Sequence, residues 1–461
     1  MHSEDTLPTR GLERELGKRA DTWTADDLAE LVKARGIRLV SLMHVGADGW
    51  LKALDFVPRT RAHLCDIIEG GERADGSSLF AGTGIRPGAS DILLRPRLRS
   101  AFVDPFAAEP TLVLLCAHLA RDGTPLPQSP DTIVRRAHER FVAETGVELH
   151  ALGEVEYFLG KRRSDADIWG QRERGYHATS PFLFGERLRR RAMTVLAEIG
   201  VPIKYAHGEV GYIPAADGDD TIWEQHEVEL ALAPLPEAAE GVLLTQWVLR
   251  NLGHADGLRV NFDPIVRQGH AGSGMHFHFS PVRDGQHLGG RSADGTLEGP
   301  AQWLIAGLVR SGGSLMAFGN RSDASFVRLG QAREAPSAVT WGEFDRSALV
   351  RLPILARTAA GRSVSPPTVE FRLPDGSAHP FYLLAGVAQA ALAGRAVTDL
   401  GALLERSSAA RARLDPQGAI PLPRSVPEIA AALGANREVL EAGGVFPPAM
   451  IDSLIAALEP R

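Results

Sequence analysis

The chain contains 461 residues, of which 50 are basic and 57 acidic, and its formal charge is −7. This length exceeds that of one small core and predicts at least two domains. The slight acidity excludes a general nucleic-acid binder, and no apolar run reaches the roughly 18–20 residues of a membrane span. With only two cysteines and no N-terminal signal core, we expect a reduced, cytoplasmic protein without membrane or nucleic-acid partners.

The N-terminal quarter predicts a small mixed unit. Residues 1–30 are polar and charged, and we expect a short helical arm or a partly ordered tail. Residues 37–57 alternate in character on both sides of an Asp-Gly turn, which predicts a β-hairpin. A helix near residues 61–69 and a strand at residues 111–118 complete a domain that we place at residues 31–125.

The remaining residues, 126–461, predict a larger α+β domain. Ser129-Pro130 indicates the start of a helix, with serine as the N-cap and proline in the first turn, and Gly146 indicates its end. Ser180-Pro181 predicts a second helix that begins in the same way and ends at Gly200. Further long helices are expected at residues 237–252, 300–316 and 380–397.

Four short segments each place two polar residues two positions apart around an apolar residue. On a β-strand such residues share one face. Burying that face is costly unless its charges are paired or bind metal, so four converging segments make sense around shared cations. The segments are Glu154-Val155-Glu156, Glu227-Val228-Glu229, His276-Phe277-His278 and Glu370-Phe371-Arg372.

The residue types in these segments suit a hard divalent cation. Carboxylates with imidazoles, and no thiolates, are typical of Mg²⁺ or Mn²⁺ ligands rather than of structural zinc. A single segment of this kind is more often a solvated strand face, and spacing alone leaves both interpretations open. Gly272 and Gly274 precede the histidine pair, and glycine there lets the backbone approach a ligand closely.

The sequence contains no phosphate-binding G-x-x-x-x-G-K-[ST] loop. If the protein uses ATP, arginines and bridging metals must hold the phosphates instead. Each arginine taken alone is more typical of a surface salt bridge. The candidates are Arg328, Arg346, Arg351 and Arg372.

Six motifs follow one another along the chain: Asp75-Gly76-Ser77-Ser78, Glu154-Val155-Glu156, residues 272–278, Glu334-Ala335-Pro336, residues 369–375 and residues 441–446. Together and in this order, they resemble the bacterial and archaeal type I glutamine synthetases and their γ-glutamyl-amine ligase relatives. The resemblance covers most of the chain. It implies an α+β fold, with an N-terminal β-grasp domain before a catalytic domain built on an antiparallel, half-barrel sheet with helices.

The resemblance also implies two metal sites for Mg²⁺ or Mn²⁺, with ATP as co-substrate. One metal, near the amine, would be held by Glu156, Glu209 and Glu227. The other, at the ATP phosphates, would be held by Glu154, His276 and Glu370.

The same resemblance assigns the substrate contacts. Nucleotide contacts would come from His278, Ser280 and Arg351. Glutamate contacts would come from Gly272, Arg328 and Arg372. Arg346 matches the arginine at the transferred phosphate.

The acceptor side is implied to lie between neighbouring subunits of stacked six-membered rings, a dodecamer. Asp75 would reach in from a neighbour and deprotonate ammonium, while Ser78 and Tyr176 line the pocket and Glu334 closes it on a flap. Glutamate would first attack ATP to form an acyl phosphate, and the amine would then displace phosphate. Excluding water protects such an intermediate.

Several positions depart from the family pattern. Ala271 stands where an asparagine usually touches the amino acid, and Thr368 where an arginine usually contacts nucleotide. Lys204 replaces a common acidic residue, and Asp217-Gly218-Asp219-Asp220 adds an acidic turn. The last tyrosine is Tyr382, so we expect no adenylylation of a late loop.

Four functions remain open on this basis. The first is a glutamine synthetase that uses ammonium, and the second is a γ-glutamyl ligase for a small amine or polyamine. The third is a non-catalytic paralogue that binds nucleotide, and the fourth is a metal-dependent hydrolase that needs no ATP. The complete set of expected metal ligands argues against the third.

Overall fold

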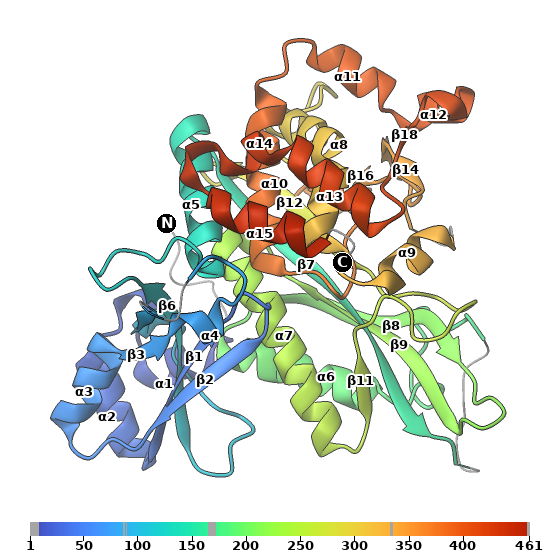
Figure 1. Ribbon diagram of the computed structural model, residues 1–461. Helices are drawn as coiled ribbons and strands as arrows, with labels where there is room; N and C mark the ends of the chain where they lie inside the picture. The colour runs from blue at the N-terminus through green and yellow to red at the C-terminus, as the bar shows by residue number, and fades with distance from the viewer. Residues whose placement is uncertain (1–8, 86–87, 89, 165–171, 332–334, 459–461) are drawn as a thin grey trace.

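The computed structural model describes residues 9–85, 88, 90–164, 172–331 and 335–458. The chain forms two units, each built on its own β-sheet (Figure 1). The smaller, N-terminal unit lies beside a larger unit whose C-terminal helices stand at the top of Figure 1. The chain thus has the predicted α+β fold, with a small N-terminal domain before a large domain on a curved sheet.

The small sheet has six strands among the described residues, in the order β2-β1-β6-β4-β3 with β5 paired to β6. β1 (Leu39–Val45) and β2 (Leu51–Phe56) form the predicted antiparallel hairpin. β6 (Thr111–Leu119), which confirms the strand predicted at residues 111–118, runs parallel to β1, so the sheet is mixed. The other strands are β3 (Glu72–Asp75), β4 (Asp91–Pro96) and β5 (Phe102–Val103).

The N-terminal helices belong to the core of the small domain rather than to an arm. α2 (Ala25–Arg35) packs against α3 (Arg61–Gly70). It buries Leu28 in the same apolar cluster as Leu12 of α1 (Gly11–Leu16). The domain boundary that we expected at residue 30 therefore falls inside a helix, because the apolar face of α2 needs the small sheet to cover it. The short elements here are η1 (Ala20–Thr22), α4 (Gly76–Leu79) and η3 (Leu98–Ser100).

The large sheet has ten strands among the described residues, seven of them in the path β15-β16-β17-β12-β7-β9-β8. Its central strand, β7 (Glu148–Arg162), pairs antiparallel with β12 (Met275–Arg283) and β9 (Thr221–Leu230). The others are β8 (Ile203–Ile213), β10 (Ala233–Pro234), β11 (Arg259–Asn261), β13 (Gln286–His287), β15 (Trp341–Glu343), β16 (Val350–Leu352) and β17 (Val369–Phe371). β14 (Ala338–Val339) and β18 (Ile420–Pro421) form a separate pair.

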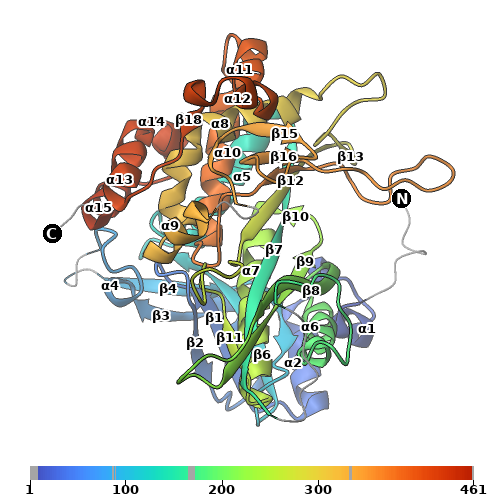
Figure 2. The same ribbon diagram turned by 90° about the vertical axis from the view of Figure 1, so that its right-hand side faces the viewer.

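Four long helices cover the large sheet and confirm the helices predicted there. α5 (Pro130–Thr145) ends before Gly146, as expected. Together with α7 (Leu235–Ala255), α8 (Gly299–Gly319) and α10 (Pro380–Arg395), it fills the main apolar core. The C-terminal helices gather at one end of β7 and the β8–β9 hairpin at the other (Figure 2). The remaining elements are α6 (Glu186–Ile199), α9 (Asp323–Gly330), α11 (Leu400–Arg406), α12 (Ala409–Leu414), η4 (Pro416–Gly418), α13 (Val426–Ala435), α14 (Arg437–Glu441), η5 (Ala442–Gly444) and α15 (Pro448–Leu458).

The helix predicted to begin at Ser180-Pro181, with Pro181 as its first residue, begins five residues later, and that prediction was wrong at its start. α6 starts at Glu186 and ends before Gly200, as expected at that end. The preceding loop is fixed by Glu224, whose carboxylate accepts hydrogen bonds from the backbone of Phe184 (3.0 Å) and Gly185. These hydrogen bonds to a distant residue thus shift the start of the helix away from the position that the local sequence predicts.

The two domains meet at a buried polar junction. The hydroxyl of Ser129, expected to cap α5, instead pairs with Nδ1 of His118 at 2.8 Å. Nε2 of His118 lies 3.1 Å from Nδ1 of His44. Nearby, Arg97 of the small domain contacts Glu240 of α7 at 2.5 Å. Paired polar groups therefore fix the small domain against the helices of the large one.

Among the described residues, no single helix has the length and apolar composition needed to cross a membrane. One bent pair, α10 with α11, meets both criteria together, at an angle of 119°.

Candidate functional site

The register of the large sheet brings the four predicted segments together. Glu154 of β7 lies opposite His276 of β12 on one side and Glu229 of β9 on the other. Glu156 lies opposite Glu227, and His278 lies opposite Glu370. The spacing of two residues therefore places all four segments on one face of adjacent strands, with their apolar centres on the other face.

A cavity of about 350 Å³ opens over this face. Eleven of the residues predicted for the site line it. They are Glu154, Glu156, Tyr176, Glu209, Glu227, Gly272, His276, Arg328, Arg346, Arg351 and Arg372.

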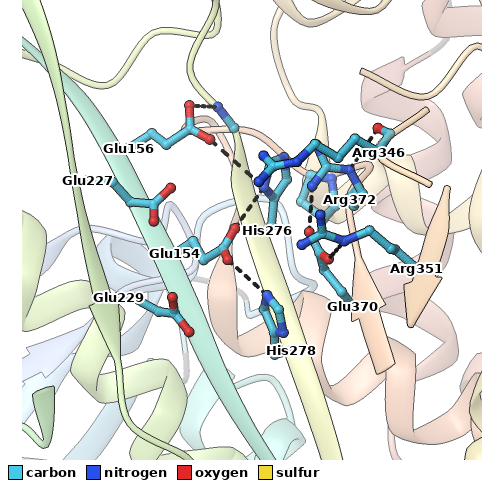
Figure 3. Close-up of polar contacts among 12 residues, drawn as sticks. Glu154, Glu156, Glu227, Glu229, His276, His278, Arg346, Arg351, Glu370 and Arg372 are labelled. Atoms are coloured by element: carbon cyan, nitrogen blue, oxygen red, sulfur yellow. Dashed lines mark hydrogen bonds and ion pairs between the residues drawn. The ribbon is translucent and has the colours of Figure 1, made fainter. Parts of the chain in front are cut away.

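Glu154 lies at the centre of the first predicted metal group. Its two oxygens lie 2.9 Å from Nδ1 of His276 and 2.9 Å from Nε2 of His278 (Figure 3). Burial opposes the charge of Glu154, but the two imidazoles outweigh it and hold the pKa of Glu154 well below its usual value. Ligand atoms of Glu154, His276 and Glu370 lie within 4.8 Å of one another, as a shared cation requires.

Glu370 joins this group to the arginines. Its carboxylate is fully buried and accepts hydrogen bonds from Nε of Arg351 and from Nη1 of Arg372, the latter at 2.5 Å. Burial raises the pKa of Glu370, but the charges of His278 and the two arginines outweigh that effect, so the net shift is downward. We call Arg346, Arg351, Arg372 and Glu370 the arginine end of the cavity.

Glu156 is held by the glycine-rich segment before β12. Its Oε2 accepts hydrogen bonds from the backbone N–H of Gly274 at 2.8 Å and from Nε2 of Gln225 at 2.9 Å. A Cβ on Gly274 would come within 2.5 Å of Nε2 of His276, and a Cβ on Gly272 within 2.5 Å of the Pro264 carbonyl. Both predicted glycines are therefore required for this close approach.

Glu227 is the least satisfied charge in the cavity. It is 5% exposed. Figure 3 draws no contact between its carboxylate and those of Glu154 and Glu156, and among the described residues its ion-pair contact is Nε2 of His207, 3.2 Å from Oε1. Burial, together with the charges of Glu154, Glu156 and Glu209, raises the pKa of Glu227 well above its usual value. We call Glu156, Glu209, Glu227 and His207 the acid end of the cavity.

His207 joins the acid end although it was not among the residues predicted for the site. Ligand atoms of His207, Glu209 and Glu227 lie within 4.8 Å of one another, whereas we expected Glu156 as the third member. Burial lowers the pKa of His207, against a hydrogen bond to Gly208 that raises it. The signal available in the sequence was the alternation of β8, which puts His207 and Glu209 on one face.

Two of the residues expected to contact the nucleotide, His278 and Ser280, are buried and do not line the cavity. His278 bonds Thr368 through Nδ1 at 2.8 Å. Ser280 is fully buried, where its hydroxyl bonds the Pro367 carbonyl at 2.9 Å, and it does not line the cavity. Lys204 contacts Oε1 of Glu229 at 2.6 Å, so the substituted lysine neutralises an acidic residue that we had assigned no role.

Arg328, one of the two arginines expected to contact glutamate, donates hydrogen bonds to the protein itself. Arg328 is buried and lines the cavity, and its Nη1 donates to the carbonyl of Leu373 at 3.1 Å. Its Nη2 donates to Nε2 of His276 at 3.2 Å. Arg328 thereby fixes the imidazole so that Nδ1 faces Glu154.

The predicted acceptor residues are divided between two places. Tyr176 lines the cavity, but Asp75 and Ser78 lie in β3 and α4 of the small domain and do not. Ser78 donates to Oδ2 of Asp75 at 2.6 Å, and hydrogen bonds from Ser78 and Ser77 lower the pKa of Asp75. Glu334 lies outside the described residues.

Aromatic rings form the rim of the acid end. Tyr176 is 48% exposed and stacks on His177, with ring centroids 4.3 Å apart. Tyr205, 43% exposed, lies 5.9 Å from the His207 ring. We call Tyr176, His177, Tyr205 and His207 the aromatic rim; of these only Tyr176 was predicted.

Beside the rim, the carboxylate of Glu173 lies against the backbone of Ala271. The backbone N–H of Ala271 donates to Oε2 of Glu173 at 3.1 Å, and Glu173 Oε1 lies 3.1 Å from Nδ1 of His270. Both Ala271 and Glu173 line the cavity. Where a neutral amide donor was expected, the cavity thus presents an acidic side chain.

Comparison with known proteins agrees with this arrangement. The family model described as glutamine synthetase, catalytic domain, matches residues 127–459. A glutamine synthetase of Neisseria gonorrhoeae is 30% identical over 426 residues, 85% of this chain and 86% of its own. A 3-hydroxylaminophenol mutase of Cupriavidus pinatubonensis is 28% identical over 463 residues, 93% of each chain.

Solved structures share the fold. A Plasmodium falciparum glutamine synthetase superposes with a TM-score of 0.77 at 17% identity, over 95% of both chains. A complex of GmaS with ADP gives a TM-score of 0.73 at 20% identity, over 93% of this chain and 94% of that one. The matched family model spans both ends of the cavity, and the chain belongs to the glutamine synthetase family of ATP-using, metal-dependent ligases.

Proposed function

We propose that this protein ligates the side-chain carboxylate of glutamate to ammonia, with ATP cleaved to ADP and phosphate. Glutamate attacks the terminal phosphoryl group of ATP to form an acyl phosphate, and ammonia then attacks the acyl carbon and releases phosphate. One observation carries the proposal: a single cavity places buried carboxylates at one end and arginines at the other.

The donor sets fit divalent cations. Glu227 is a buried carboxylate with like charges around it, and Glu154, His276 and Glu370 place oxygen and imidazole ligands within reach of one point. Bound Mg²⁺ or Mn²⁺ would neutralise phosphate charge during transfer. The residues that would hold them are Glu154, His276 and Glu370 on one side and Glu156, Glu209 and Glu227 on the other.

The arginine end would hold the transferred group. Arg346 and Arg351 line the cavity next to Glu370, and their guanidinium groups suit phosphate oxygens. Arg372, 2% exposed, is fixed by its bonds to Glu370 and to the Arg346 carbonyl at 3.0 Å. Such fixed cations stabilise the charge that spreads over the phosphoryl group in the transition state.

The acceptor side requires a second copy of the chain. Asp75 and Ser78 lie outside the cavity of their own chain, so a neighbour in a ring-shaped assembly, by family resemblance a dodecamer, would supply them. Asp75 would take the proton of ammonium and Tyr176 would line its pocket. A monomer would then be inactive, and Glu334 would close the site.

The direct test is ADP release by the purified protein with ATP, Mg²⁺ or Mn²⁺ and glutamate, with ammonium or one amine added at a time. We expect ADP and γ-glutamyl product in equal amounts, and none without nucleotide. Product without ATP would point to a hydrolase, and ATP binding without product to a regulatory paralogue.

A second candidate acceptor is an organic amine rather than ammonia. The exposed faces of Tyr176 and Tyr205 next to Glu209 and Glu227 favour it, because aromatic faces and carboxylates together suit an alkylammonium ion. Glu173 beside Ala271 adds negative charge on that side. A higher kcat/KM for an alkylamine than for ammonium would decide for this candidate.

A further inference from the structure

The pairing of β8 with β9 places His207 opposite Glu227. The ring N–H at Nδ1 of His207 donates to the carbonyl of Gly208 at 3.1 Å, and a carbonyl can only accept. Nε2 therefore carries the lone pair, and it lies 3.2 Å from Oε1 of Glu227. Two electron-rich atoms at that separation require a proton or a metal ion between them.

Glu227 gives independent reason to expect a cation at this point. It is 5% exposed, and in the described part of the chain the ion-pair contact of its carboxylate is with Nε2 of His207. Figure 3 shows the carboxylate turned toward those of Glu154 and Glu156, with no contact to either. Ligand atoms of His207, Glu209 and Glu227 lie within 4.8 Å of one another.

Glu156 is less available to the same cation. Its Oε2 already accepts two hydrogen bonds, from Gly274 at 2.8 Å and from Gln225 at 2.9 Å. Ligation by that oxygen would cost one or both of these bonds. His207, in contrast, spends its one N–H on the Gly208 carbonyl and keeps Nε2 for a ligand.

We propose that His207 is a ligand, through Nε2, of a divalent cation at the acid end, together with Glu209 and Glu227. The inference rests on the metal dependence in the proposed function and adds a nitrogen ligand to it. The Nδ1–H bond to Gly208 fixes the tautomer and orients the ring, as outer contacts of metal-ligating histidines do. Nitrogen ligation favours Mn²⁺, Co²⁺ or Zn²⁺ over Mg²⁺ at this end.

The first experiment titrates Mn²⁺ alone into the chelator-treated full-length protein, with free Mn²⁺ followed by electron paramagnetic resonance. His207→Asn should weaken one of the Mn²⁺ sites by at least about tenfold and leave the other unchanged. His177→Asn is the matched control, since its ring lies 4.7 Å from that of His207 on the same rim but joins no ligand group. Equal binding by wild type and His207→Asn would overturn the proposal.

A second experiment tests the bond itself. In His276→Asn/His278→Asn protein both imidazoles beside Glu154 are gone, so nitrogen hyperfine coupling to bound Mn²⁺ must come from His207, and it should vanish when His207→Asn is added. Bound Mn²⁺ without nitrogen coupling in His276→Asn/His278→Asn would instead mean that a proton, not a metal, separates His207 from Glu227. Far-ultraviolet circular dichroism verifies that each variant folds. Because neither measurement contains ATP, glutamate or an amine, the outcome is independent of whether the ligase reaction is confirmed.

Discussion

Each end of the cavity buries a glutamate carboxylate, but the negative charge of that carboxylate is balanced in a different way at the two ends. At the arginine end, both oxygens of Glu370 accept bonds from Arg351 and Arg372. At the acid end, Glu227 is surrounded by other carboxylates, and its ion-pair contact within the described residues is Nε2 of His207 at 3.2 Å. The charge of Glu370 is therefore balanced by side chains of its own chain even without a metal, whereas under the proposed function the charge of Glu227 is balanced by a bound cation.

At the arginine end, side chains of the protein supply the cationic partners of the buried carboxylate. At the acid end, a bound metal ion would supply the positive charge and would therefore contribute to the stability of the fold. A buried carboxylate held by two arginines is costly to disturb, because removing one charge strands the others. A buried carboxylate without a partner already carries that cost. The same type of substitution, glutamate to glutamine, should thus have opposite effects on stability at the two ends.

The largest effect is expected for Glu227→Gln, which removes a cation ligand. Ligase activity should fall by about a thousandfold, since a bound cation contributes several kcal/mol to stabilising transferred phosphate. In the presence of a chelator, however, the variant should be more stable than wild type by about 1–3 kcal/mol, because an unsatisfied buried charge is gone. Urea unfolding of wild type and variant, with Mn²⁺ and with the chelator, measures the change in unfolding free energy under each condition. A loss of stability with the chelator present would contradict the comparison.

Glu370→Gln should have the opposite effect on stability. Without Glu370, Arg351 and Arg372 share a buried region with one neutral acceptor, and the variant should lose about 3 kcal/mol of unfolding free energy with the chelator present. The surface ion pair of Arg19 with Asp21 offers a control, because Asp21→Asn at an exposed pair should change stability very little. If Glu370→Gln unfolds at the same urea concentration as wild type, the arginine end is not self-sufficient.

Much of this site could be predicted from the sequence because strand pairing follows simple periodicity. Residues two positions apart share one face of a strand, so the pairs Glu154 and Glu156, and His276 and His278, predicted a polar strand face. The glycines before β12 were equally informative, since only glycine admits the contact between Gly274 and Glu156. The α5 helix was predicted from the proline in its first turn and the glycine that follows its end, and α10 also begins at a proline.

What could not be predicted depends on contacts between distant segments. The start of α6 is set by Glu224, which lies 39 residues from Gly185. The shielding of Glu229 by Lys204 needs the pairing of β8 with β9. Asp75 is visible as a motif in the sequence, but the cavity of its own chain is not lined by it. Sequence periodicity orders residues within a strand and says little about which neighbour satisfies them.

A third way to bury a titratable group appears at the domain junction, where His44 and His118 stay neutral. Burial, with the charge of Lys52, lowers the pKa of His44 to about 4; burial, with His44 and Arg97, lowers that of His118 as well. Both groups bind protons more readily when unfolded, so their stability contribution is complete above the unfolded pKa of about 6.5 and is lost as pH falls through it. The free energy of unfolding should drop by about 2 kcal/mol from pH 7 to pH 5 for each such group.

The measurement is urea unfolding at pH 7 and pH 5 for wild type and His44→Asn. The variant should lose part of the pH dependence, because one titrating group is gone. His254→Asn, at an exposed position near the end of α7, serves as the control and should keep the wild-type dependence. An unchanged slope in His44→Asn would mean that the junction opens before its histidines titrate.

The smallest expected effect concerns the acceptor, at the rim of the acid end. Tyr205→Ala removes an aromatic face next to the carboxylates and should lower kcat/KM for an alkylamine by about tenfold relative to ammonium, the scale of one partly exposed cation–π contact. Tyr205→Phe keeps the ring and should retain the preference, although it loses the phenol that bonds Glu229. Phe182, 54% exposed but not in the cavity lining, provides a control for loss of a surface ring. If Tyr205→Ala lowers kcat/KM equally for the alkylamine and for ammonium, Tyr205 acts through its hydrogen bond to Glu229 and does not select the amine. Ammonium then remains the acceptor that the cavity fits.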